Sequence, residues 1–432
     1  MRVLIANEAY ESDLLNHGDL AMLQAAVRRL CRLWRDTRVW VATEQPEALR
    51  GALPEATPIG ATDFVHWRRF YFDHPFDRLQ RRLPPPLARR LASAEASVRD
   101  RMPGVFYTVL RARLAWHGQS LAGIDSYFQA FDAADLVVVA GGGHFVQGYE
   151  RHAEVILSVL QAAIRRGKPT AMLSLGIAPM ADPALAALMA EVLPRVDLFA
   201  VREGLAALPL LHRLGVSPDR ILVTGDDAVE LAYRARPAHA GRAIGANLRV
   251  APYSEVENAA VAAVGEALRE AAGRLATVLL PVPISLDASG YDPAAIRVLL
   301  GGGVADGGEA IDSPAKVVDQ VGRCRVVVTG SYHAGVFALA QGIPVVALAR
   351  SAYYRHKFLG LADQFGRGCE VVPLDPLPRR AQLVNAIERA WHTAEDVRAP
   401  LLAAARRQIE ASHEAYRRLG ELRRPHLVGR VA

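Results

Sequence analysis

Short apolar runs alternate along the chain with longer segments whose apolar residues recur about every 3.6 positions. Residues 2–6 have the pattern of a buried strand, residues 7–19 that of a long polar loop, and residues 20–34 the periodicity of a helix. Further strands are predicted at residues 39–42, 135–140, 170–175, 198–201 and 221–224. Repeated strand–turn–helix units of this kind predict a doubly wound parallel sheet.

The alternation of predicted strands and helices stops at residues 233–241, where the sequence YRARPAHAG predicts a linker. A second α/β series follows, with strands predicted at residues 243–248, 277–281, 325–328 and 344–348, and with a strongly helical tail at residues 379–423. The sequence therefore predicts an α/β protein with two Rossmann-like, doubly wound domains, residues 1–235 and 242–432. Two such domains facing a cleft form the GT-B arrangement, and ligands of open parallel sheets bind at the carboxyl ends of the strands.

The composition is that of a protein with two hydrophobic cores, because 51% of its 432 residues are hydrophobic. Its three cysteines, Cys31, Cys324 and Cys369, are far apart and form no CxxC pair, which predicts reduced thiols without a disulfide or metal framework. The chain enters a strand at once, and no apolar run approaches the roughly 18 residues of a membrane span. We therefore expect a soluble cytoplasmic protein with no metal site.

The net charge of +6 favours an anionic ligand or surface. Residues 60–125 depart from the strand–helix pattern, and eleven arginines lie between His66 and Arg113 against four acidic residues. Two interpretations of this insertion remain open. It is either a solvated helical excursion with its aromatic side chains turned inward, or a segment that contacts an anionic membrane surface or a lipid-linked substrate. No nucleic-acid-binding module is recognisable, so we expect no nucleic-acid partner.

Polar turns follow several of the predicted strands. At the end of the first unit, Asn16 and the amide of Gly18 are expected at the cleft, and Asp19 is expected to be the N-cap of the next helix. A capped helix start also explains this spacing without a ligand. Asp226 and Asp227 follow the strand at residues 221–224, where they are either bases on the cleft wall or caps of the adjoining segment.

A glycine run, Gly141-Gly142-Gly143, follows the strand at residues 135–140 and is itself followed by His144. Consecutive glycines let backbone amides approach a ligand closely. The run matches neither the Gly-x-Gly-x-x-Gly fingerprint nor a P-loop, so the sequence indicates no nucleotide cofactor.

Residues 329–348, TGSYHAGVFALAQGIPVVAL, join the strand at 325–328 to a helix of small residues and a second strand. His333 therefore lies at the carboxyl end of a strand and at the start of a helix, at the mouth of the predicted cleft. An imidazole there is suited to proton transfer near neutral pH. A histidine at a helix start can also be merely structural.

The polar turns together resemble those of the polysaccharide pyruvyl transferase family, over most of the chain. The matching pieces are Asn16-His17-Gly18-Asp19, Asp135 with Gly141-Gly142-Gly143, Ser174-Leu175-Gly176-Ile177, Val201-Arg202-Glu203, Gly225-Asp226-Asp227, Asn247-Leu248-Arg249, and Ser331-Tyr332-His333-Ala334 with Gly342-Ile343-Pro344 and Lys357 downstream. Their order and spacing are more specific than any one of them. The insertion at residues 60–125 matches poorly.

The resemblance implies transfer of a pyruvyl group from phosphoenolpyruvate to two hydroxyls of a sugar, which forms a cyclic ketal and releases phosphate. The acceptor implied is a glycan or lipid-linked glycan that is a precursor of the cell envelope or of an exopolysaccharide. The implied enzyme needs no cofactor besides its co-substrate. It works in the cytoplasm, with peripheral contact at the inner face of the membrane left open. The second domain would hold the donor, and the first domain, with the insertion, the acceptor.

The resemblance assigns proton transfer to His333, and the phosphate or carboxylate of the donor to Arg249 above all, with Arg202 and Lys357 as further cations. Ser331 lies on the donor side, where the family often carries an arginine. Either Arg249, Lys357 or Arg355 then takes over the donor-binding role of that arginine, or the donor is not phosphoenolpyruvate. Two rival functions therefore remain, a GT-B glycosyltransferase that uses a nucleotide sugar and a non-catalytic member of the family.

Overall fold

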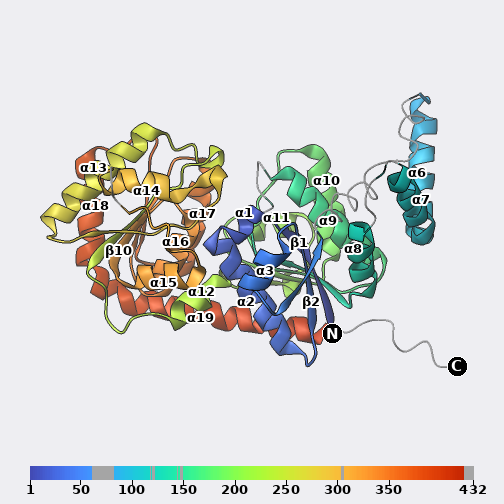
Figure 1. Ribbon diagram of the computed structural model, residues 1–432, viewed down its shortest axis with the longest axis horizontal. Coiled ribbons are helices and arrows are strands. Elements are labelled where there is room, and N and C mark those ends of the chain that lie inside the picture. Colours follow the sequence, from blue (N-terminus) through green and yellow to red (C-terminus); the bar gives the residue numbers. More distant parts are fainter. Residues whose placement is uncertain are drawn as a thin grey trace.

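The computed structural model describes residues 1–60, 82–116, 118, 122–143, 145, 149–302 and 306–422. Two α/β domains lie side by side, and a long C-terminal helix runs beneath both of them (Figure 1). Each domain has a single sheet in which all pairings are parallel. The prediction of two Rossmann-like, doubly wound domains in a GT-B-like arrangement is confirmed.

The N-terminal sheet has the strand order β3-β2-β1-β4-β5-β6-β7 within the described residues. Its strands are β1 (Arg2–Ala9), β2 (Arg38–Thr43), β3 (Ala56–Gly60), β4 (Leu136–Ala140), β5 (Thr170–Leu175), β6 (Leu198–Val201) and β7 (Ile221–Val223). Its helices are α1 (Glu11–Leu14), α2 (His17–Leu33), α3 (Pro46–Ala52), α8 (Ala122–Ala133), α9 (Glu150–Arg165), α10 (Pro183–Val192), α11 (Ala207–Arg213) and α12 (Ala228–Arg234). Side chains of α8 to α11 cover one face of the sheet and those of α2 and α3 the other.

The C-terminal sheet has the order β12-β11-β10-β8-β9. Its strands are β8 (Ala243–Asn247), β9 (Leu279–Pro281), β10 (Cys324–Thr329), β11 (Val345–Ala349) and β12 (Cys369–Pro373). Its helices are α13 (Asn258–Arg274), α14 (Asp292–Leu300), α15 (Pro314–Gly322), α16 (Tyr332–Ala340), α17 (Ala352–Phe365) and α18 (Arg380–His392). The strands β10 and β11 are rich in valine because helices bury them from both faces.

The segment before α2 differs from the polar loop that the sequence predicts. The strand β1 continues to Ala9, and a short helix, α1, precedes α2. The N-cap of α2 is Asn16, whose side-chain oxygen accepts hydrogen bonds from the amides of Gly18 and Asp19 at 3.0 and 3.4 Å. The prediction of Asp19 as N-cap is therefore wrong. Because Asn16 supplies the capping oxygen, the carboxylate of Asp19 is free to face the cleft.

The C-terminal helix α19 (Ala394–Glu421) connects the two domains. Leu401, Ala404 and Ala405 pack into the core between α16 and α17, whereas Tyr416 and Leu419 pack against the N-terminal sheet. Between these parts, the buried guanidinium of Arg29 lies among carboxylates of α12 and the turn before it, and it donates a hydrogen bond to Ser412 of α19. The tail helix therefore contributes to both cores.

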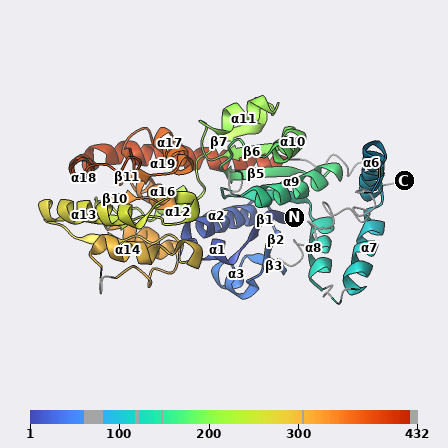
Figure 2. The same ribbon diagram turned by 90° about the horizontal axis from the view of Figure 1, so that it is seen from above.

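The described part of the insertion before α8 forms the helices α6 (Pro85–Arg101) and α7 (Pro103–Trp116). The helix α8 packs on the N-terminal sheet, whereas α6 packs mainly on α7, and the pair stands away from the body at the end opposite the C-terminal domain (Figures 1 and 2). The aromatic run of the insertion, residues 66–72, lies outside the described residues. In the part of the chain that is described, no helix combines the length and apolarity needed to cross a membrane.

Candidate functional site

A cleft lies between the two domains at the carboxyl ends of β1, β4, β8 and β10. Its N-terminal wall comes from α1, α2 and the turn after β4, and its C-terminal wall from the turn after β8 and the first turns of α16 and α17. The segment before α2 also joins the domains directly, because the amide of His17 donates to the carbonyl of Ile284 at 2.8 Å, and that of Leu286 to Leu15 at 2.9 Å. These bonds fix the first turn of α2 against the C-terminal domain.

The cleft brings together predicted residues from five separate segments of the chain. Those that line it are Asn16, Asp19, Gly142, Gly143, Arg249, Ser331, His333 and Lys357. Four predicted residues lie behind this surface instead: Gly18, Gly141, Arg202 and Asp226. His144 lies outside the described residues.

His333 lies in the first turn of α16 and is buried. Gly18 packs directly against its ring, and a β-carbon at position 18 would overlap the imidazole. The glycine of the Asn16-His17-Gly18-Asp19 turn is therefore required by the histidine of the opposite domain. The sequence interpretation places the amide of Gly18 at the cleft as a donor. The structure instead gives Gly18 a steric role, because only a residue without a side chain fits against the His333 ring.

Asp226 lies beneath His333, with its Oδ2 atom 3.6 Å from Nε2 of the imidazole. The same oxygen is 3.5 Å from Nη1 of Arg202, and all three side chains are buried. Burial by itself would raise the pKa of Asp226, but His333 and Arg202 outweigh it and lower that pKa. Asp226 is therefore an anion at neutral pH. It is not a base on the cleft wall, because the turn before α12 lies under α16.

Arg202 follows β6, and its guanidinium stacks 4.5 Å from the centroid of the Tyr332 ring. Tyr332 lines the cleft and Arg202 lies behind it. The expectation that Arg202 touches the donor directly does not fit this placement, because its charge faces Asp226. Arg202 helps to lower the pKa of Asp226, which in turn lies beneath His333.

Arg249 follows β8 and lines the cleft as the sequence predicts. Its Nε and Nη2 atoms donate to the two carboxylate oxygens of Asp292 at 2.7 and 3.1 Å, and its Nη1 donates to the hydroxyl of Tyr253 at 3.0 Å. Burial disfavours the charged guanidinium, but Asp292 outweighs it and raises the pKa of Arg249. The guanidinium is thus a permanent cation in a fixed orientation, with N–H groups left for a ligand.

Asp292 is a site residue that the sequence analysis missed. Besides Arg249, its carboxylate accepts hydrogen bonds from the side chain of Asn247 at 2.9 Å and from the amides of Ile284 and Ser285 at 2.8 and 2.9 Å. The only local signal is Asp292-Pro293, which is typical of any helix start. Asp292 orients Arg249 through contacts between residues about 45 positions apart in the sequence. A local pattern of residue types cannot reveal such contacts.

Lys357, in the second turn of α17, points into a group of tyrosine rings. Its Nζ atom is 4.4, 5.5 and 5.9 Å from the ring centroids of Tyr353, Tyr332 and Tyr354. It forms no ion pair with the described part of the chain, and burial, followed by the charge of Arg202, lowers its pKa to about 7. Gly143 lies against this ammonium, since a β-carbon there would be 3.3 Å from Nζ. An anion in the cleft would restore the full charge of Lys357.

Ser331 is the N-cap residue of α16, but its hydroxyl makes no capping hydrogen bond. Its amide is occupied by the hydroxyl of Thr329 at 2.8 Å. The first amides of α16 have no intrahelical acceptor, and the residues that carry them, Tyr332 and His333, line the cleft. The amino end of α16 is therefore a third positive element beside Arg249 and Lys357.

Comparison with protein families identifies the chain. The family described as polysaccharide pyruvyl transferase matches residues 16–352. The chain belongs to this family. The matched region begins at Asn16 and includes both Arg249 and His333, whereas Lys357 lies five residues beyond it. No protein among curated sequences matches the chain.

Solved structures with the same two-domain fold are distant in sequence from this pyruvyl transferase family member. The UDP-GlcNAc 2-epimerase of Neisseria meningitidis bound to UDP-GlcNAc is 13% identical, with a TM-score of 0.52 over 98% of this chain and 100% of that one. The UDP-GlcNAc 2-epimerase of Methanocaldococcus jannaschii is 11% identical, with a TM-score of 0.54 over 98% and 100%. The glycotransferase of kitacinnamycin is 13% identical, with a TM-score of 0.51 over 96% and 98%. These likenesses show the fold alone.

Proposed function

We propose that this protein transfers the pyruvyl group of phosphoenolpyruvate to two hydroxyls of a sugar in a cell-envelope or exopolysaccharide precursor. The products are a cyclic ketal and phosphate. The observation that carries the proposal is that His333, with the buried carboxylate of Asp226 beneath it, lines one cleft with Arg249, Lys357 and the amino end of α16. The reaction proposed needs no cofactor beyond the donor.

The donor carries a phosphate and a carboxylate on adjacent groups, and the cleft offers matching positive charge. Arg249 is held by Asp292 with N–H groups to spare, which suits bidentate binding of either anion. Lys357 and the first amides of α16 lie on the same wall. Ser331, whose hydroxyl is free of a capping bond, adds a small donor group where a longer side chain would take up space.

The chemistry begins with proton transfer. His333 gives a proton to C3 of the enol, and C2 gains oxocarbenium character, so that a sugar hydroxyl can attack it. Asp226 stabilises the imidazolium before this step, as a buried carboxylate does in hydrolase triads. Attack by the second hydroxyl expels phosphate and closes the ketal. Of the two hydroxyl protons released, one replaces the proton that His333 gave and the other leaves on phosphate.

Asp19 is the residue we assign to deprotonating the acceptor. It lines the cleft on the N-terminal wall, and its carboxylate makes no hydrogen bond within the described part of the chain. The alternatives that the sequence offered are both occupied. Asp226 lies under His333, and Asp227 accepts hydrogen bonds from Ser412 and Tyr416 at 2.7 and 2.8 Å.

Thermal shift with phosphoenolpyruvate tests the donor assignment. We expect stabilisation of the wild type and of His333→Ala, but not of Arg249→Ala.

Phosphate release with a panel of glycosides and extracted lipid-linked oligosaccharides, followed by mass spectrometry for a ketal, tests the reaction. His333→Ala should bind the donor and release no phosphate. Stabilisation by UDP in place of phosphoenolpyruvate would instead support a nucleotide-sugar glycosyltransferase, and donor binding without turnover on any acceptor a non-catalytic member.

A further inference from the structure

The α6–α7 hairpin, residues 85–116, concentrates exposed apolar side chains on a part of the molecule that the proposed chemistry does not use. Trp116 is 89% exposed, Met102 55% and Val109 49%, and Leu87, Val98 and Val105 are also exposed. Half of the large hydrophobic side chains that are exposed in the described residues belong to this hairpin. Since soluble proteins rarely gather such side chains without a partner, this concentration indicates an interaction surface.

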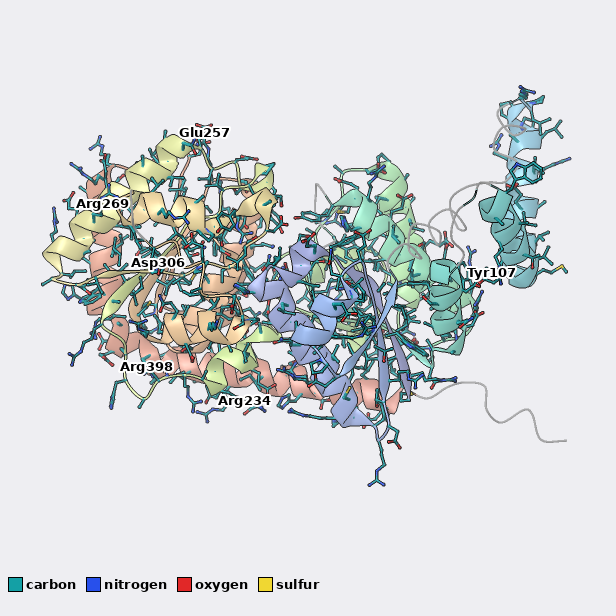
Figure 3. The ribbon with its side chains drawn as sticks, viewed as in Figure 1. Tyr107, Arg234, Glu257, Arg269, Asp306 and Arg398 are labelled. Carbon is teal, nitrogen blue, oxygen red and sulfur yellow. The ribbon has the colours of Figure 1, made fainter. Side chains whose placement is uncertain are left out.

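The exposed apolar side chains of α7 lie on one face of that helix. Val105, Val109 and Trp116 recur at the helical spacing of i, i+4 and i+11, so they share one side of α7. The opposite side of α7 holds it to the body: the hydroxyl of Tyr107 is hydrogen bonded to Asp125, and its ring packs 4.7 Å from that of Phe128. Figure 3 shows Tyr107 at this junction. The hairpin is thus attached by one face and presents the other outward.

The positive charge of the hairpin favours an anionic partner. Residues 85–116 contain six arginines against Glu95 and Asp100, and Glu95 is buried. Arg89 and Arg90 are exposed on α6, close to Leu87 along the helix. Helices that combine exposed apolar side chains with arginines are typical of the interface of an anionic bilayer, where the apolar side chains enter the acyl boundary and the guanidinium groups stay at the phosphates.

We propose that the α6–α7 hairpin docks this protein on an anionic membrane surface. A second copy of the chain fits less well, because pairing two hairpins would bring two positive segments together. Nucleic acid would meet the arginines but would offer no apolar surface to the side chains of α7. The hairpin lies at the far end of the N-terminal domain (Figure 1), so docking leaves the interdomain cleft uncovered. The proposal does not depend on the pyruvyl-transfer proposal.

Co-sedimentation of the full chain with vesicles tests it. We expect binding to vesicles of phosphatidylcholine with phosphatidylglycerol, weakening as salt rises, and little binding to phosphatidylcholine alone. Each arginine near an anionic surface strengthens binding about fivefold, so Arg89→Glu with Arg90→Glu should weaken binding at least about tenfold. The matched control is Arg406→Glu with Arg407→Glu, an exposed arginine pair on α19 that should change binding little.

The apolar face has its own pair of variants. Val109→Asp should weaken vesicle binding, whereas Val278→Asp, at a position 63% exposed on the C-terminal domain, should not. Circular dichroism and thermal unfolding check that each variant folds. The proposal is overturned if the wild type does not bind anionic vesicles, or if the hairpin variants bind them as tightly as their controls do. It is also overturned if Val109→Asp instead dissociates a dimer, or if nucleic acid alone is bound.

Discussion

The Nε2 atom of His333 in the C-terminal domain lies 3.6 Å from the Oδ2 atom of Asp226, which the turn after β7 of the N-terminal domain provides. Neither atom has a hydrogen-bond partner among the described residues, and both are buried. A buried carboxylate without a full partner is costly unless it faces a positive charge. The carboxylate of Asp226 therefore places a buried negative charge beside both His333 and Arg202.

Asp226→Asn tests this pairing. Because the amide cannot stabilise the imidazolium, we expect kcat for phosphate release to fall about a hundredfold or more, with KM for phosphoenolpyruvate nearly unchanged. Asp219→Asn, at an exposed aspartate just before β7, is the control. A variant that loses donor binding while keeping kcat would contradict the assignment.

Gly18→Ala should displace the imidazole. The added β-carbon would overlap the His333 ring, so we expect phosphate release to fall at least about a hundredfold while the fold is retained. Gly273→Ala is the matched control, because a β-carbon in that turn of α13 meets no atom within 4 Å. That control should keep full activity and gain about 0.5–1 kcal/mol in free energy of unfolding. Equal activities of the two variants would rule out the steric role of Gly18.

Donor affinity should depend on the protonation of Lys357. Its pKa is lowered to about 7, so the ammonium is fully present below that pH and is lost above it. The affinity for phosphoenolpyruvate should therefore fall as the pH rises from about 6.5 to 8.5, approaching tenfold per unit. Calorimetric titration of Lys357→Met should show weaker binding without this dependence. Lys316→Met, at an exposed lysine of α15, should titrate like the wild type.

Asp292→Asn should loosen Arg249. The variant leaves a buried guanidinium without its bidentate carboxylate, which costs about 3 kcal/mol in free energy of unfolding by analogy with other broken buried pairs. Donor affinity should fall about tenfold or more, because the guanidinium loses its fixed orientation. Denaturant unfolding and calorimetry measure the two effects. Asp287→Asn, at a half-buried hydrogen-bonded aspartate nearby, should show neither effect. Unchanged donor affinity in Asp292→Asn would remove Asp292 from the site.

The contact between α2, α12 and α19 should make stability depend on pH. Burial alone would raise the pKa of Glu230, but Arg29 and His413 outweigh it and lower that pKa to about 2. A carboxylate with a depressed pKa stabilises the fold above its ordinary value near 4.5, and this contribution is lost as the pH falls toward 2. The Tm difference between wild type and Glu230→Gln should thus be large at pH 7 and shrink below about pH 4.5. A difference independent of pH would contradict this view.

The sequence by itself determined the architecture and the place of His333. Apolar runs and helical periods are local properties, so the strands around the cleft were predicted closely, as was the histidine at the start of α16. The sequence patterns did not predict the outermost strand of each sheet on one side, nor the fold of the segment before α2. The strands β3 and β12 were not predicted, and the segment at residues 7–19 folds into the end of β1, α1 and the start of α2 rather than a loop.

Only the tertiary structure decided what surrounds His333. Asp226 is 107 positions away in sequence, and it reaches the imidazole because α12 packs into the core of the C-terminal domain. Likewise Asp292 meets Arg249, and the tyrosines meet Lys357, only when separate turns converge at the sheet edges. Residue type and spacing specify what a side chain can do, whereas its charge state and its partner depend on burial and on neighbours from distant segments.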